Sequence, residues 1–171
     1  MKILVTGGAG FVGSHTVDVL LEERHDIVVI DNLDPQVHGP MHEYPRNLST
    51  HRNNPRLRFI RGDVRDRSAL VEAVAGVESV LHLAAAVGVG QSMYEPFHYC
   101  SVNVGGTAQL LDIVANERTS VRKIVVASSM SIYGEGAYRC EACGEAYPAV
   151  REKADLAAAH WELKCPFCTK P

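Results

Sequence analysis

Short apolar runs alternate with amphipathic stretches along the first 128 residues. The runs are rich in Val, Ile and Leu and short enough to be strands buried on both faces. They cover Lys2–Thr6, Ile27–Ile30, Arg56–Ile60, Ser79–Ala84 and Lys123–Ser128. Strands that alternate with helices predict βαβ units and a doubly wound parallel α/β sheet. Because such crossovers are right-handed, we expect the strand order 3-2-1-4-5.

Three helices are expected between these strands. The first covers Gly10 to about Arg24, the second follows an Asp66 N-cap and closes on Gly76, and the third runs from Pro96 to about Glu117. On the first helix Val12, Thr16, Val19 and Leu20 are expected to share the buried face. The polar stretch 32–56 is predicted to be a loop with a short helix. After Ser131 the hydrophobic pattern stops, apart from a weakly helical stretch at 154–161.

The stretch "TGGAGFVGSH" places Gly7, Gly10 and Gly13 between the first strand and the first helix. The first glycine permits a sharp turn, the second a close approach to a pyrophosphate, and the third close packing of helix on strand. The free N–H groups of the helix N-terminus attract phosphate. Asp31 ends the second strand, where a carboxylate can accept both ribose hydroxyls and repel a 2′-phosphate. The pattern favours NAD binding over a glycine turn with a capping Asp.

Six blocks resemble the extended short-chain dehydrogenase/reductase family, which contains the nucleotide-sugar epimerases and dehydratases. They are "TGGAGFVGSH", "DNL" at 31–33, "GDVRD" at 62–66, "HLAA" at 82–85, "NVGGT" at 103–107 and "SSMSIYG" at 128–134. The resemblance implies a Rossmann-like NAD-binding domain over residues 1–136. It implies cofactor contacts at the positions Gly7, Gly10, Phe11, Val12, Gly13, Asp31, Asn32, Asp63, Val64, Leu83, Ala84, Ala85 and Asn103.

Within that resemblance Asp63 and Val64 flank the adenine and Asn103 lies beside the nicotinamide half. The pattern of the third helix puts Asn103 on an apolar stripe with Cys100, where an amide needs hydrogen-bond partners. Asn103 either caps neighbouring backbone or meets a buried ligand. Cys100 is expected to be a small core residue.

The resemblance makes Ser129 the catalytic serine, whose hydroxyl bonds the reacting oxygen of the sugar, unless it only closes a turn at the strand end. The family's Tyr-x-x-x-Lys pair occurs nowhere in the 171 residues. We therefore expect the chain to be the N-terminal part of an enzyme about twice as long, and to be inactive alone. The sheet would be incomplete, with the fifth strand as an unprotected edge, so we expect the part to behave poorly in isolation. A homodimer is what the family implies for the full-length protein.

Cys140-x-x-Cys143 and Cys165-x-x-Cys168 lie 21 residues apart within the segment 137–171. Four thiolates in two hooks suit tetrahedral zinc, and a site closed by four ligands is structural. A redox pair, a disulfide and unliganded thiols are the alternatives, although a cytoplasmic chain keeps its thiols reduced, which counts against a disulfide. His160 is a further candidate ligand. We expect residues 137–171 to be a zinc-binding insertion.

The cysteine segment, together with "DNLDPQVHG", "AAAVGVGQSMYE" and "SSMSIYGEG", looks most similar to the dTDP-L-rhamnose 4-epimerase group of the family. In that group NAD takes a hydride from C4 of the sugar and returns it to the other face. Epimerases of UDP-glucose or UDP-glucuronate and sugar dehydratases are the alternatives. A different class, a non-catalytic NAD-binding sensor whose zinc loop docks a partner, also fits the motifs.

The composition adds three expectations. A net charge of −3 gives no reason to expect a nucleic-acid partner. No stretch approaches the roughly 20 apolar residues of a membrane span, so no membrane partner is expected. The N-terminus "MKILVTGG" has no secretory signal, which predicts a cytoplasmic protein.

Overall fold

The computed structural model describes residues 1–40 and 43–170, and residues 41–42 of the predicted loop lie outside this description. The chain divides into two compact units, Met1–Ala127 and Ser128–Pro171. The first unit ends at residue 127, nine residues before the end of the domain that the motifs predict over residues 1–136.

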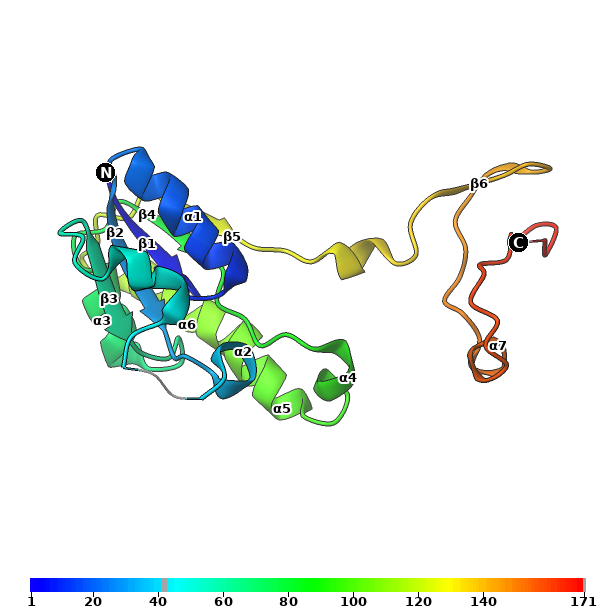
Figure 1. Ribbon diagram of the computed structural model, residues 1–171, viewed down its shortest axis with the longest axis horizontal. Helices are drawn as coiled ribbons and strands as arrows, with labels where there is room; N and C mark the ends of the chain where they lie inside the picture. Colours follow the sequence, from blue (N-terminus) through cyan, green and yellow to red (C-terminus); the bar gives the residue numbers. More distant parts are fainter. Residues whose placement is uncertain (41–42, 171) are drawn as a thin grey trace. The chain divides into compact units, whose positions relative to one another are not determined.

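The first unit contains a five-stranded parallel sheet in the order β3-β2-β1-β4-β5, which confirms the predicted order (Figure 1). Its strands are β1 (Lys2–Thr6), β2 (Asp26–Asp31), β3 (Leu57–Arg61), β4 (Ser79–His82) and β5 (Lys123–Val126). The central strand β1 pairs Val5 with Val29 of β2 and with Leu81 of β4. The carboxyl ends of β1, β2 and β4 therefore meet at one edge of the sheet.

Helices cover both faces of this sheet (Figure 1). On one face α3 (Arg67–Val74) and α6 (Gly106–Asn116) pack over Leu4, Val28 and Ile30. On the other face α1 (Phe11–Glu22) and the 3-10 helix Arg46–His51 pack over alternate residues of the same strands. Because successive strand residues point to opposite faces, an unbroken apolar strand supplies both cores at once.

The buried face of α1 differs from the predicted one. Gly13, Ser14 and Val17 are buried, whereas Val12 and Val19 are exposed by 64% and 57%. A Cβ on Gly13 would lie 2.2 Å from the carbonyl oxygen of Gly7, so the helix packs on the glycine turn through this position. Because the helix approaches the glycine turn at Gly13, the face that contains Gly13 and Val17 is turned towards the sheet, and Val12 and Val19 are turned towards solvent.

The predicted helix from Pro96 is continuous but changes its winding. It starts as α5 (Pro96–Tyr99), passes through a π-helical segment at Cys100–Gly105, and ends as α6. The π turn shifts the side chains that precede α6 relative to those within it. The prediction that Cys100 is a core residue is wrong, because Cys100 is exposed while Val102, Leu110 and Ile113 are buried.

The loop after β2 contains two short helical turns, α2 (Pro35–His38) and the 3-10 helix Arg46–His51. The sequence predicted a loop with one short helix in this stretch. Asp66 caps α3, accepting hydrogen bonds from the backbone N–H groups of Ser68 and Ala69. A further short helix of this unit is α4 (Val89–Ser92). In the part of the chain that the structure describes, no helix is long and apolar enough to cross a membrane.

The second unit is built around an antiparallel hairpin of β6 (Tyr138–Cys140) and β7 (Gly144–Ala146). A 3-10 turn, Met130–Tyr133, precedes the hairpin, and α7 (Lys153–Ala157) follows it. Arg151 joins distant parts of this unit, pairing with the Glu135 carboxylate and donating from Nε to the carbonyl of Trp161 at 2.8 Å. The two CxxC sequences lie at the hairpin turn and near the end of the unit.

Candidate functional site: a cleft at the strand ends and a four-cysteine cluster

A cleft of about 340 Å³ opens where β1, β2 and β4 end. Twelve of the thirteen residues expected to contact a cofactor line it. They are Gly7, Gly10, Phe11, Val12, Gly13, Asp31, Asn32, Asp63, Val64, Leu83, Ala84 and Ala85. This is the position at which open parallel sheets bind ligands, because the loops after neighbouring strands diverge there.

The glycine turn brings backbone close to the floor of the cleft. Gly7 has φ +67°, and a Cβ there would lie 2.8 Å from the backbone of Ala84. No side chain caps the N-terminus of α1, and no acidic residue lies in its first turn. The positive end of the helix dipole is thus left for an anion.

Asp31 is buried at the end of β2, and backbone groups already hold its carboxylate. Oδ2 accepts the Ala9 N–H at 3.0 Å, and Oδ1 accepts the Leu33 N–H at 2.9 Å. Nε2 of His38, from α2, lies 3.5 Å from Oδ1. A carboxylate has about four acceptor positions, so Asp31 can hold the glycine turn and still accept a hydroxyl group of a ligand.

A second carboxylate lies beside Asp31 in the cleft. Asp63 accepts hydrogen bonds from Arg65 at 2.8 Å and from the side-chain amide of Asn32 at 3.1 Å. The Arg65 guanidinium holds the pKa of this carboxyl well below its usual range. Asp63 therefore keeps its negative charge at any ordinary pH, while four donors, three of them from Arg65, already occupy its two oxygens.

Three side chains, Thr107, His82 and Thr6, form a continuous hydrogen-bonded chain beneath the cleft. The Thr107 hydroxyl donates to the Asn103 carbonyl at 2.6 Å, so its oxygen accepts from Nε2 of His82 at 3.0 Å. Nδ1 of His82 must then accept from the Thr6 hydroxyl at 2.8 Å. The Thr6 oxygen in turn accepts the backbone N–H groups of Leu83 and Ala84. Burial lowers the pKa of His82, in keeping with this neutral tautomer.

Asn103 fills the first of the two roles that its sequence position allowed. Its side chain accepts the N–H of Ala86 at 2.8 Å and donates to the carbonyl of the same residue at 3.0 Å. Asn103 itself does not line the cleft, whereas Ala86 does. It therefore fixes the loop after β4 from behind, and the π turn is what places it there.

Ser129 belongs to the second unit, as the N-cap of the 3-10 turn Met130–Tyr133. Its oxygen accepts the N–H of Ser131 at 3.1 Å. Ser129 therefore does close a turn at the end of the strand, which was one of the two roles considered for it. Because the bond uses the oxygen as acceptor, the hydroxyl proton is not committed to it.

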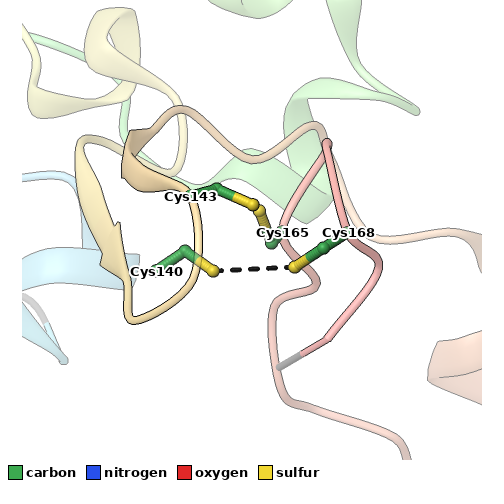
Figure 2. Close-up of side chains that lie close together, drawn as sticks. All are labelled: Cys140, Cys143, Cys165 and Cys168. Carbon is green, nitrogen blue, oxygen red and sulfur yellow. Dashed lines mark hydrogen bonds between the residues drawn. The ribbon is translucent and has the colours of Figure 1, made fainter.

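The four cysteines of the second unit converge on one point (Figure 2). All four Sγ atoms lie within 4.8 Å of one another, and Cys140 Sγ is 3.6 Å from Cys168 Sγ. Tetrahedral zinc with bonds of about 2.3 Å requires sulfur atoms about 3.8 Å apart. The cysteines are unpaired thiols, and His160 is not part of the cluster.

The electrostatics of the cluster favour a cation. The backbone N–H of Cys168, followed by that of Phe167, lowers the pKa of the Cys165 thiol to about 7. The neighbouring thiols, Cys168 foremost, raise the pKa of Cys143 to about 12. Four thiolates cannot share so small a volume unaided, and a divalent ion would supply the missing positive charge.

The two hooks share one backbone design. In each, the residue after the second cysteine has positive φ, +82° at Gly144 and +60° at Thr169. In the second hook the Thr169 N–H donates to the Cys165 carbonyl at 2.9 Å, and the Cys165 N–H donates to the Lys170 carbonyl at 2.7 Å. The chain thus turns back after each pair, which directs both sulfurs of a hook to the same side.

A family model described as GDP-mannose 4,6 dehydratase matches residues 4–148. The chain belongs to this family of NAD-dependent nucleotide-sugar epimerases and dehydratases. The match covers the cleft, Ser129 and the first cysteine hook.

The chain is also similar in sequence to named nucleotide-sugar epimerases. A dTDP-L-rhamnose 4-epimerase of Burkholderia thailandensis is 37% identical over 164 residues, which are 95% of this chain and 44% of that protein. A UDP-glucose 4-epimerase of Neisseria meningitidis serogroup C is 42% identical over 136 residues, 78% of this chain and 38% of that protein. The chain thus spans less than half of either relative.

The fold of the family is also found in a solved dTDP-glucose 4,6-dehydratase from Streptomyces venezuelae, determined as a double mutant with NAD bound. It superimposes with a TM-score of 0.68 at 34% sequence identity, over 78% of this chain and 41% of that one. The Rossmann-like character expected from the motifs is therefore confirmed.

Several residues in or beneath the cleft of this epimerase/dehydratase chain were not identified from the sequence. Thr6 ends an apolar strand and looks like one more β-branched core residue, yet its hydroxyl serves the loop after β4. Gln36 and His38 lie in a polar stretch without periodicity, and Tyr99 lies on a helix read only for its apolar stripe. The polar Thr within an otherwise aliphatic strand was the one available signal.

Proposed function

We propose that the first unit binds NAD in the cleft, as the N-terminal part of a nucleotide-sugar 4-epimerase. The observation that carries the proposal is the glycine turn beside the Asp31 carboxylate, at the shared edge of β1 and β2. A 2′-phosphate would bring negative charge against Asp31, which supports NAD over NADP.

Each wall of the cleft has a proposed part in holding the cofactor. The first turn of α1, Phe11 to Gly13, offers N–H groups to the pyrophosphate. Asp31 and Asn32 accept and donate at the adenosine ribose, while Asp63 and Val64 flank the adenine. Leu83, Ala84 and Ala85 line the path after β4, and Asn103 supports the nicotinamide half through its two bonds to Ala86.

The proposed reaction is oxidation at C4 of the sugar followed by reduction from the opposite face. NAD, when bound, supplies the hydride acceptor and donor for these two steps. The Ser129 hydroxyl hydrogen-bonds the reacting oxygen of the sugar and helps to pass its proton on. The 171 residues contain no Tyr-x-x-x-Lys pair, so we propose that this chain alone binds the cofactor without turning over sugar.

dTDP-L-rhamnose is the proposed substrate. The alignment with the Burkholderia enzyme extends over 164 residues and so into the cysteine segment, whereas that with the UDP-glucose 4-epimerase covers 136. UDP-glucose, UDP-glucuronate and a dehydratase reaction are the alternatives within the same family.

We further propose that Cys140, Cys143, Cys165 and Cys168 hold one structural zinc ion. The convergence of four sulfurs within 4.8 Å supports this. Four cysteine ligands fill the tetrahedral coordination of zinc and leave no position for water or substrate, which is typical of a structural site. The ion would fix the two hooks together and contribute its binding free energy to the folding of the second unit.

A homodimer is proposed for the full-length protein. On the helical segment after Pro96, Phe97 and Val104 are exposed by 85% and 66%. Such apolar positions on one exposed element support contact with a second copy. Sedimentation of the full-length protein tests this, and a monomer at micromolar concentration would contradict it.

The activity is tested on the protein translated from the complete open reading frame. It should interconvert C4 epimers of dTDP-L-rhamnose faster than those of UDP-glucose, without added reductant. Ser129→Ala should lower kcat by about 10²- to 10⁴-fold while NAD remains bound. Equal or greater activity on UDP-glucose would replace the substrate assignment, and an unchanged kcat in Ser129→Ala would remove the assigned serine.

A further inference from the structure

One amide oxygen joins the two sides of the cleft. Oε1 of Gln91, in α4, accepts from Nε2 of Gln36, in α2, at 2.8 Å. The hydroxyl of Tyr99 in α5 lies 3.3 Å from the same oxygen. Gln36 and Tyr99 both line the cleft. The contact between the two glutamines spans 55 residues of sequence.

The strand order places these residues on opposite sides of the glycine turn. Gln36 follows β2, while Gln91 and Tyr99 follow β4, and β1 lies between these two strands. A hydrogen bond between Gln36 and Gln91 therefore crosses from one side of the cleft to the other.

Both ends of this bond are anchored. On the β2 side Asp34 caps α2 by accepting the backbone N–H of Gln36 at 2.9 Å. On the β4 side the Tyr99 hydroxyl also lies 3.1 Å from the carbonyl of Val87. Gly88, with φ +135°, leaves the room that Gln91 uses, because a Cβ there would lie 2.2 Å from Oε1. Local structure thus holds the two glutamines in place.

The bond is also easily opened. Gln36 and Gln91 are both exposed, so water can replace either partner. A hydrogen bond of this kind contributes little net free energy, because its groups are solvated when it breaks. A weak, anchored bond across a cleft opens and closes without disturbing either side.

Resting on the proposed NAD site, we propose that Gln36 and Gln91 form a latch across the dinucleotide cleft. The latch opens for the cofactor to enter or leave and closes again over it. Gln91 is the shared acceptor and Gln36 the donor. Neither residue is assigned to the sugar chemistry.

The test measures NADH association and dissociation by stopped-flow fluorescence. Gln36→Met and Gln91→Met keep side-chain length but remove the bond. Each should raise both rate constants by about two- to tenfold, with a smaller change in Kd. Gln91→Glu retains an acceptor oxygen for the Gln36 amide and should restore rates close to those of the unaltered chain.

The double variant Gln36→Met/Gln91→Met distinguishes the loss of one shared bond from two independent effects, one at each glutamine. Since one bond is broken either way, its rates should match those of the single variants rather than their product. NADH binding with unchanged rates, or with multiplicative effects, would overturn the latch alone. Absence of NADH binding to the unaltered chain would overturn the proposed function and the latch with it.

Discussion

The carboxylate of Asp31 accepts the backbone N–H of Ala9 at 3.0 Å, across 22 residues of sequence. The acidic residue at the end of β2 thereby fixes the shape of the glycine turn after β1. The same side chain is the proposed partner of the adenosine ribose. If the proposed site is right, one buried carboxylate serves both folding and cofactor binding.

Replacing Asp31 should affect both properties. Asp31→Ala leaves the buried N–H groups of Ala9 and Leu33 without their acceptor, which we expect to cost about 1–3 kcal/mol of unfolding free energy. NADH affinity should fall at least about tenfold through the loss of a charge-assisted hydrogen bond. Urea unfolding and calorimetry measure the two effects. Asp26→Ala, at the exposed start of the same strand, is the control. Unchanged NADH affinity in Asp31→Ala would remove Asp31 from the cofactor site.

His82 should make the first unit sensitive to mild acid. Burial lowers its pKa, so the unfolded chain takes up a proton at a higher pH than the folded chain does. The stability contributed by neutral His82 is fully present above its unfolded pKa, about 6.5, and is lost as the pH falls towards the folded value. Urea unfolding between pH 7.5 and 5.5 measures this dependence. It should be weaker in His82→Gln, and an identical slope in the variant would contradict the assignment.

The cysteines allow a test with an internal control. The purified chain should contain about one zinc ion, and Cys143→Ser should lose most of it. Cys100→Ser should retain the metal, because Cys100 is exposed and lies outside the cluster. A thiol reagent should find one reactive cysteine in the metal-loaded chain and five after chelation. Well under one ion per chain, or five reactive thiols before chelation, would eliminate the zinc site.

The positive φ values in the hooks give opposite predictions for two substitutions. Thr169, at φ +60°, is a β-branched residue in a region that favours glycine, so Thr169→Gly should tighten zinc binding. Gly144→Ala, at φ +82°, should weaken it. Each change should be worth about 1 kcal/mol, or about fivefold in Kd, by competition with a chromophoric chelator. Effects of the same sign would show that backbone conformation does not control the hooks.

The sheet could be predicted because its strands are short, apolar and separated by helices. Periodicity could not predict the buried face of α1, because that face is set by a glycine. Gly13 has no side chain to mark it as a contact, yet it determines which residues turn inward. Cys100 was misplaced for a related reason, since a π turn is invisible to a rule that assumes 3.6 residues per turn.

The strands of the cysteine segment were not predicted from the sequence, but its candidate site was. Its strands, β6 and β7, have three residues each and carry no readable alternation, so the hairpin was not predicted. The spacing of the cysteines nevertheless identified all four members of the cluster. Ligand spacing is a local chemical constraint that survives where hydrophobic patterning is too short to read.

The close approach of Cys140 and Cys168 has a consequence for how such a segment can change in evolution. The cluster also brings the sulfur atoms of Cys143 and Cys165 within 4.8 Å of one another, so residues 144–164 between them form a closed loop. Doubling the length of a flexible closed loop costs only about 0.6 kcal/mol in closure entropy. Insertions and deletions between the end of β7 and Cys165 are therefore expected to be tolerated, whereas a change in spacing inside either cysteine pair is not.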